Sequence, residues 1–244
     1  MEIGSKIKRS FFQYTITAIY FAVLLAECYF LYNRNYYTRV YVRPFLMPIL
    51  MLVYIQQIIS RNHLLLIAAM IAACLADTFT IRFVVFHQWM GLGLYALSFF
   101  MMAILFFKLE WFSFKTSKLA LFISLVGLLT YIGIMEYFIN SRNLLISNVN
   151  VIFIYAGCLA LLSLAVLNIY FNNKTYNFTF AVVAVGLLIL GNISFESSLF
   201  VFHRRHTSVD VITAFCYGLY QFIMVGGIIK VRDKIMGADY FTHE

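Results

Sequence analysis

The stretch LLLIAAMIAACLADTFTIRFVV, residues 64–85, decides the fold class. Its apolar residues cover the length of about 20 residues that a helix needs to cross the hydrocarbon core of a bilayer. The apolar run is continuous and does not alternate with polar residues, which favours a helix over a strand of a membrane β-barrel. One carboxylate, Asp77, lies well inside the run. The stretch therefore predicts a membrane-spanning helix that contains an acid where water should be absent.

The composition of the whole chain predicts several such helices. Of the 244 residues, 63% are hydrophobic and 11% are charged. A soluble domain has about 45–50% apolar and about 25% charged residues, so no soluble fold would hide this apolar excess. We predict an all-α fold, a polytopic membrane helix bundle of about eight transmembrane helices that forms a single transmembrane domain over residues 1–244. The predicted spans are 11–31, 40–59, 64–85, 89–107, 118–138, 149–171, 178–202 and 209–229.

The net charge of +8 is explained by the membrane and not by a nucleic-acid partner. Most Lys and Arg residues fall between the predicted spans, where insertion bias and lipid headgroups account for them. No basic domain outside the membrane offers a nucleic-acid-binding face. An eight-span chain has both ends on one side, and that side carries eleven of the 18 Lys and Arg residues. Both termini are therefore predicted to be cytoplasmic, in the cell membrane if the protein is bacterial.

No motif in the sequence predicts a metal ion or another cofactor. The four cysteines lie in apolar runs without C-x-x-C spacing, which is typical of small buried hydrophobic residues. His203 and His206 are three residues apart without a clear further ligand set, so an interfacial position explains them better than a metal. Phosphate-binding loops and the common hydrolase motifs are absent. The oligomeric state is left open, and a homo-oligomer is compatible with the sequence.

The carboxylates of four predicted spans are expected in the outer half of the bundle. With both termini inside, the spans that hold Glu27, Asp77, Glu136 and Glu196 run outward. At about 1.5 Å per residue, Asp77 lies roughly 10–12 Å below the outer end of its span, and Glu27 and Glu196 lie roughly 6–9 Å below theirs, while Glu136 is near the interface. Small residues, Ala69, Ala73 and Ala76, line the side of the helix that carries Asp77 and let neighbouring helices approach. Asp77 is therefore expected to point into the bundle.

Three further polar residues are expected in the same half. Arg43 enters from the outer face at the start of span 40–59. Tyr217 and Gln221 lie roughly 12–18 Å below the outer end of span 209–229, and their spacing puts both side chains on one helix face. This co-location depends on the number of spans and not on which side is cytoplasmic.

An acid at the centre of a span has two interpretations. An Asp there costs about 2.5–3.5 kcal/mol on insertion scales, and such residues often mark substrate or ion sites. In the structural alternative, Asp77 pairs with Arg43 or Arg82, or forms a hydrogen bond between helices. The residues alone leave both interpretations open.

Five segments carry a resemblance to a known family. They are RPFLMPIL (43–50), CLADTF (74–79), GLGLYALSF (91–99), GNISFESSL (191–199) and YGLYQFI (217–223). In the same order, they resemble the Lys-Pro-x-x-Met-Pro, Gly-Asp, Gly-Leu-rich, Ser-Asp and Tyr-x-x-Ala-Gln segments of the YhhN-like, lysoplasmalogenase family of eight-span membrane proteins. The resemblance covers about residues 40–230.

The resemblance also shows departures from the family pattern. Asp77, Tyr217 and Gln221 match directly, whereas Arg43 stands for a lysine and Glu196 for an aspartate. The histidine usual in the fourth span corresponds to Phe99, and the glycine before the first aspartate corresponds to Ala76. The chain therefore resembles a divergent member of the family.

The resemblance implies an integral-membrane hydrolase with a lysophospholipid substrate. Members of the family are associated with cleaving the vinyl-ether bond of lysoplasmalogens to a fatty aldehyde and glycerophospho-ethanolamine or -choline. Protonation of the alkene carbon gives an oxocarbenium ion, to which water adds, and two carboxylates can divide this work as they do in glycosidases. Asp77, the deeper acid, is expected to donate the proton, while Glu196 stabilises the cation and activates water. The reverse assignment fits equally well.

The remaining site residues are expected to bind the substrate. Arg43 would hold the phosphate as a charge-assisted fork. Tyr217 and Gln221 would orient substrate or water. Glu27 is assigned to the same substrate-binding set because it too is expected in the outer half of the bundle.

Two functions of other classes stay open. Intramembrane acids also suit a proton-coupled carrier of small solutes or lipids, or a lipid-binding membrane protein without catalysis. Carriers often have helices broken at mid-membrane, but the only prolines here, Pro44 and Pro48, lie in the first turns of span 40–59. This weighs weakly against a carrier.

Overall fold

The computed structural model describes residues 2–57, 64–80, 85–109, 117–141, 149–172, 177–200 and 207–239. Within these ranges the chain is helical and contains no strand, so the predicted all-α class is confirmed. The elements are α1 (Glu2–Tyr32), α2 (Tyr36–Val42), the 3-10 helix η1 (Arg43–Phe45), α3 (Leu46–Gln57), α4 (Leu64–Thr80), α5 (Val85–Leu109), α6 (Lys118–Ser141), α7 (Val149–Asn172), α8 (Thr179–Phe200) and α9 (Thr207–Asp239).

Several helices have the length and composition of membrane spans. Among the described residues, five segments are long and apolar enough to cross a bilayer: Phe12–Tyr32, Tyr36–Ile55, Trp89–Lys108, Asn150–Asn172 and Thr207–Val231. Three shorter apolar helices accompany them, Leu64–Thr80, Lys118–Gly133 and Thr179–Ser194. These helices indicate a multi-pass membrane protein, while the count of eight spans stays a prediction.

The outer surface of the bundle is apolar, as expected for a lipid-facing surface. On α6, for example, Phe122 and Leu129 are 64% and 60% exposed. Large apolar side chains on most faces of a soluble helix would be costly in water, whereas lipid tails solvate them. The polar side chains that matter for function are therefore found inside the bundle.

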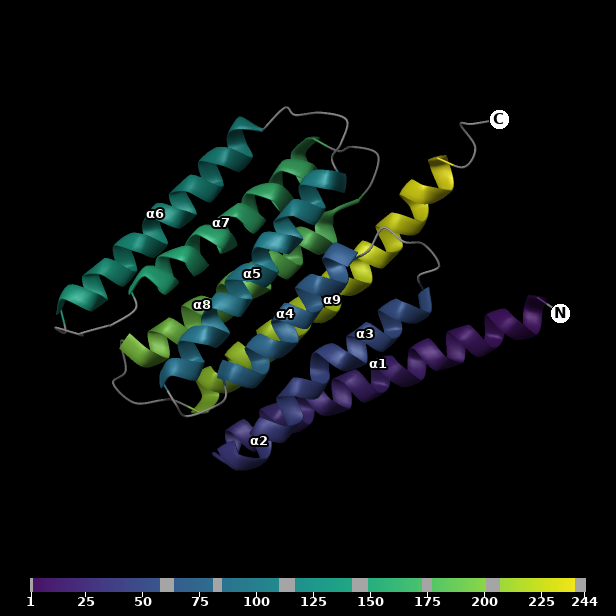
Figure 1. Ribbon diagram of the computed structural model, residues 1–244, viewed down its shortest axis with the longest axis horizontal. Helices are drawn as coiled ribbons and strands as arrows, with labels where there is room; N and C mark the ends of the chain where they lie inside the picture. The colour runs from purple at the N-terminus through teal and green to yellow at the C-terminus, as the bar shows by residue number, and fades with distance from the viewer. Residues whose placement is uncertain are drawn as a thin grey trace.

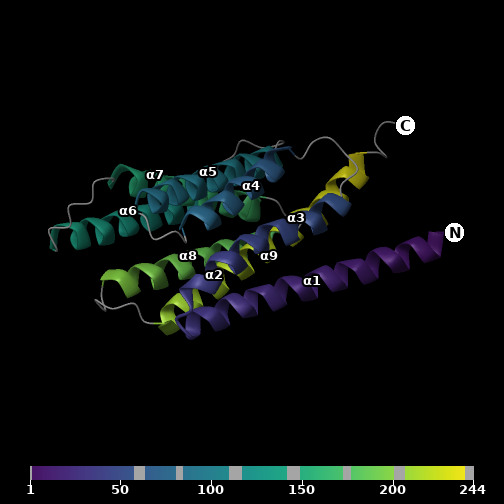
Figure 2. The same cartoon turned by 60° about the horizontal axis from the view of Figure 1, so that its bottom comes forward.

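The helices lie side by side along the long axis of the molecule, with α1 at one edge and α6 at the other (Figures 1 and 2). The strongest packing joins α4 with α5, α8 with α9, and α5 with α7. Helices α1 and α9 run antiparallel, since the Tyr20 hydroxyl donates to Gly218 O at 2.7 Å and Arg34 Nε donates to Thr207 Oγ1 at 3.2 Å. The start of α1 and the end of α9 consequently lie at one end of the bundle (Figure 1).

The predicted span 40–59 is divided into α2, η1 and α3. Pro44, which lies in the first positions of η1, has no backbone N–H to donate, and the chain tightens locally into a 3-10 turn. Before it, a short turn joins α1 to α2, with Arg34 at a φ of 58° and the Asn35 side chain accepting from Thr38 N at 3.2 Å. These two features fold α2 back toward α1 and bring its basic residues to the end of α1.

Helices α4 and α5 approach one another closely. Ala69, Ala73 and Ala76 are buried on α4, and Ser98 Oγ on α5 donates to Ala69 O at 2.8 Å. At Gly91, an added Cβ would lie 2.5 Å from Thr80 Cγ2. The small-residue side of α4 thus faces its neighbour, and Asp77, on the same side, is fully buried.

Candidate functional site

The Asp77 carboxylate lies at the centre of a buried polar cluster. Its Oδ1 accepts from Arg43 Nε at 2.8 Å and from the Tyr95 hydroxyl at 2.5 Å. Its Oδ2 accepts from Gln221 Nε2 at 3.4 Å. Four elements, α4, η1, α5 and α9, therefore meet at one carboxylate. Because the acid is 0% exposed, these partners replace the water that would otherwise solvate its charge.

All three guanidinium nitrogens of Arg43 face partners inside the protein. Besides the bond to Asp77, Nη2 donates to the Tyr95 hydroxyl at 2.9 Å, and Nη1 lies 3.6 Å from Glu27 Oε1. The guanidinium also lies over the Tyr217 ring, with Cζ 5.4 Å from its centroid, as in a cation–π contact. Arg43 therefore fixes the cluster and has little capacity left for an outside anion.

A second arginine continues the charges toward the surface. Arg39 Nε lies 3.3 Å from Glu27 Oε1, and this is its only hydrogen bond among the described residues. The side chains of Arg39 and Arg43 are 16% and 14% exposed, whereas those of Glu27 and Asp77 are 2% and 1% exposed. The order Arg39, Glu27, Arg43, Asp77 thus alternates in sign, and each buried acid lies against a partly exposed arginine. Removing one member of such a buried pair typically costs about 3–5 kcal/mol, because the other charge is left uncompensated.

Aromatic rings form the wall beside the cluster. Tyr95 and Tyr217 meet edge to face, with ring centroids 5.3 Å apart. Phe99 is 1% exposed, and its ring stacks on Tyr95 at 6.4 Å and contacts Tyr155 and Tyr220. Phe99 is therefore an apolar ring among tyrosines.

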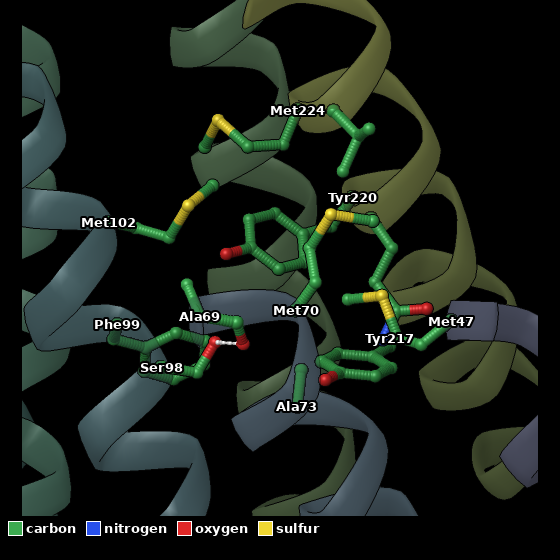
Figure 3. Close-up of a pocket in the computed structure, with 12 residues that line it drawn as sticks. Met47, Ala69, Met70, Ala73, Ser98, Phe99, Met102, Tyr217, Tyr220 and Met224 are labelled. Carbon is green, nitrogen blue, oxygen red and sulfur yellow. Dashed lines mark hydrogen bonds between the residues drawn. The ribbon is translucent and has the colours of Figure 1, made fainter. Parts of the chain in front are cut away.

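A small cavity adjoins the cluster, since Tyr217 and Gln221 belong to both (Figure 3 shows the side chains that line it). Its volume is about 10 Å³. It is lined by Met47, Ala69, Met70, Ala73, Ser98, Phe99, Met102, Tyr217, Tyr220, Gln221, Met224 and Val225. On α5 and α9 these residues follow Tyr95 and Tyr217 by one or two helical turns, and on α4 they precede Asp77 by one or two turns. Each of the three helices therefore contributes both to the polar cluster and to the cavity wall.

The structure brings most of the predicted site residues together. Arg43, Asp77 and Gln221 are in direct contact, and Glu27 and Tyr217 both contact Arg43. Glu196 belongs to α8, but its side chain lies outside the described residues, as does Arg82. Among the described residues, no group of three or more His, Cys, Asp or Glu side chains could hold a metal ion.

Two members of the cluster were missed by the sequence analysis. Tyr95 is part of the quoted GLGLYALSF segment, where a tyrosine is easily taken for a lipid-facing residue. Its position one helical turn before Phe99, on the same face, is the signal that could have identified it. Arg39 was counted only as a loop charge, although it lies one turn before Arg43.

Comparisons with protein-family models, with curated proteins and with solved structures gave no match to this chain.

Proposed function

We propose that the protein is a membrane-embedded hydrolase of the lysoplasmalogenase type, which cleaves the vinyl-ether bond of a single-chain phospholipid. The observation that carries the proposal is the Asp77 carboxylate, buried inside a membrane helix bundle and held by Arg43, Tyr95 and Gln221. A fixed, desolvated carboxylate stabilises a cation that develops beside it far more strongly than water would. The order of the resembling segments along the sequence supports the substrate.

The ion pair with Arg43 favours the reverse of the acid and base assignment first expected. In this arrangement Asp77 carries its charge, so it suits the role of cation stabiliser and base. Glu196 then donates the proton to the alkene carbon, which gives the oxocarbenium ion. Water adds to the cationic carbon and loses a proton to Asp77, which gives a hemiacetal. As the hemiacetal breaks its bond to the glycerol oxygen, Asp77 passes this proton to that oxygen and the hemiacetal hydroxyl gives its proton to Glu196. One vinyl ether and one water thus give one aldehyde and one alcohol.

The headgroup phosphate is better matched by Arg39 than by Arg43. The guanidinium of Arg43 is occupied by Asp77, Tyr95 and Glu27. The side chain of Arg39 is exposed to a similar extent as that of Arg43, but it donates only through Nε, to Glu27, within the described part of the chain. Its two terminal nitrogens form the planar fork that binds phosphate oxygens in pairs. A lysophospholipid would therefore place its phosphate at Arg39 and its ether bond nearer Asp77.

The test uses purified protein in lipid nanodiscs with a lysoplasmalogen. Fatty aldehyde is measured for the wild type, for Asp77→Asn and for Glu136→Gln, which alters an exposed acid on α6 as a matched control. We expect aldehyde from the wild type and the control, none above background from Asp77→Asn, and none from a saturated-ether analogue. Loss of a catalytic acid or base typically lowers the rate by about 10²–10⁴-fold.

Two results would overturn the proposal. Full activity of Asp77→Asn would remove Asp77 from the chemistry. A wild type that releases no aldehyde, but takes up a solute or lipid into liposomes in response to a proton gradient, would support the carrier instead.

A further inference from the structure

Only one end of the Gln221 side-chain amide has a hydrogen-bond partner among the described residues. Its Nε2 donates to Asp77 Oδ2 at 3.4 Å, whereas its Oε1 is buried and has no hydrogen-bond partner among the described residues. Flipping the amide would turn Oε1 toward a carboxylate oxygen, and two acceptors repel, so the carboxylate fixes the orientation. A buried acceptor without a partner costs about 1–3 kcal/mol. With the residue only 1% exposed, bulk water does not meet this need.

The cavity that adjoins the cluster supplies the space for a partner. Gln221 lines it, and its volume of about 10 Å³ is near the roughly 10–15 Å³ that one water molecule requires. A buried water also needs about two to four polar partners. The phenols of Tyr217 and Tyr220 are on the same wall (Figure 3), and neither hydroxyl has a hydrogen-bond partner within the described ranges. Ser98 Oγ, which donates to Ala69 O, can still accept.

The rest of the wall gives no anchor to a more polar ligand. The side chains of Met70, Met102 and Met224 lie around the ring of Tyr220 (Figure 3). Thioether sulfurs are weak acceptors and give no polar anchor. The polar side chains of the lining are therefore those of Ser98, Tyr217, Tyr220 and Gln221, and the last of these also binds Asp77.

We infer that this cavity binds one water molecule, which donates a hydrogen bond to Gln221 Oε1, and that this water adds to the substrate. The second part rests on the proposed function. Gln221 is then a positioning residue, since one end of its amide holds the water and the other end holds Asp77. The water oxygen forms the bond to the cationic carbon, and the proton it loses goes to Asp77. The site stores the nucleophile where bulk water is absent.

Hydroxyl-radical labelling by X-ray radiolysis tests the water directly, without substrate. After rapid mixing into ¹⁸O water, a slowly exchanging internal water still gives ¹⁶O products on the side chains that touch it. We expect retained ¹⁶O label on Met224 and Tyr220, and none on Met90, which is 41% exposed and does not line the cavity. Absence of retained label on Met224 and Tyr220 in the wild type would overturn the inference.

Two variants separate the water from the catalytic role. Gln221→Met removes the amide at similar volume, and Ala73→Val fills the cavity while leaving the amide in place; both should lose the retained label. For Gln221→Met we expect kcat to fall roughly 10- to 100-fold, as for loss of a hydrogen bond to a charged group, with a smaller change in KM. Retained label with unchanged kcat in this variant would contradict the role of Gln221. Retained wild-type label without any aldehyde release would leave the water site standing and refute the proposed function.

Discussion

At the scale of single residues, Tyr95 decides how Asp77 is held. Its hydroxyl donates to Asp77 and accepts from Arg43, so it closes a three-membered ring of polar contacts. A hydrogen bond to a charged group contributes about 1.5–3 kcal/mol. We therefore expect Tyr95→Phe to lower kcat/KM for lysoplasmalogen cleavage roughly 10- to 100-fold, measured as aldehyde release.

A second tyrosine provides the control for this variant. Tyr155 is also buried, but its hydroxyl donates to Asn192 Oδ1 at 2.7 Å and not to Asp77. Tyr155→Phe should lower the melting temperature in detergent to a similar extent and leave kcat/KM close to the wild-type value. An equal loss of activity in both variants would mean that Tyr95 acts through stability alone.

Residues that carry a charge could be predicted from the sequence, because a charge inside an apolar run is costly and therefore conspicuous. Asp77, Arg43 and Glu27 were found in this way, by counting their depth along helices. Tyr95 could not be identified in this way. It is one of 17 tyrosines, and tyrosine side chains occur at many depths of a membrane protein. Apart from its position one helical turn before Phe99, only the packing of α5 against α4 distinguishes Tyr95 from the others.

At the scale of helices, the contact between α4 and α5 sets the distance from Asp77 to Tyr95. A Cβ at Gly91 would lie 2.5 Å from Thr80 Cγ2 and 2.9 Å from Thr80 N, a backbone atom that cannot rotate away. Gly91→Ala must therefore push the helices apart, and overpacking of this kind costs about 1–3 kcal/mol. We expect a lower melting temperature in detergent together with lower aldehyde release.

The same helix contains the matched control. Gly93 has no atom within 4 Å of the position of an added Cβ. Gly93→Ala should keep the wild-type activity and hold or raise the melting temperature, since alanine is favoured over glycine in a helix by about 1 kcal/mol. A similar loss in both variants would show that the close approach at Gly91 does not control the site.

The break in span 40–59 shows what sequence analysis of a helix leaves undetermined. Two prolines, Pro44 and Pro48, lie near its start, and either could distort the helix. The structure tightens at η1, around Pro44, and Pro48 lies in the first turn of α3, where an intrahelical N–H is not needed. Which proline distorts the helix depends on the contact between Arg43 and Asp77. These residues are 34 positions apart in the chain, so the sequence of the span alone does not reveal the contact.

At the scale of the whole molecule, the start of α1 and the end of α9 lie at one end of the bundle, and the polar cluster lies toward the other (Figure 1). This arrangement is compatible with the predicted eight spans. The apolar content and the helical class were readable from the sequence because every span must satisfy its own backbone hydrogen bonds in lipid. The order in which helices neighbour one another was not, since lipid-facing and buried apolar residues have the same composition.

The topology itself can be tested with reporter fusions in a bacterial host. Alkaline phosphatase is active only outside the cytoplasmic membrane. Green fluorescent protein becomes fluorescent only in the cytoplasm, because it does not fold correctly after export through the general secretory route. Because eleven of the 18 Lys and Arg residues fall on the side of the termini, the positive-inside rule predicts fluorescence for fusions after Gln57 and Asp239 and phosphatase activity for fusions after Tyr32 and Ser141. Activity of the phosphatase after Asp239 would reverse the orientation. Phosphatase activity after both Tyr32 and Gln57 would mean that the divided segment α2–η1–α3 does not cross the membrane, and Arg39 and Arg43 would then approach the cluster along the surface.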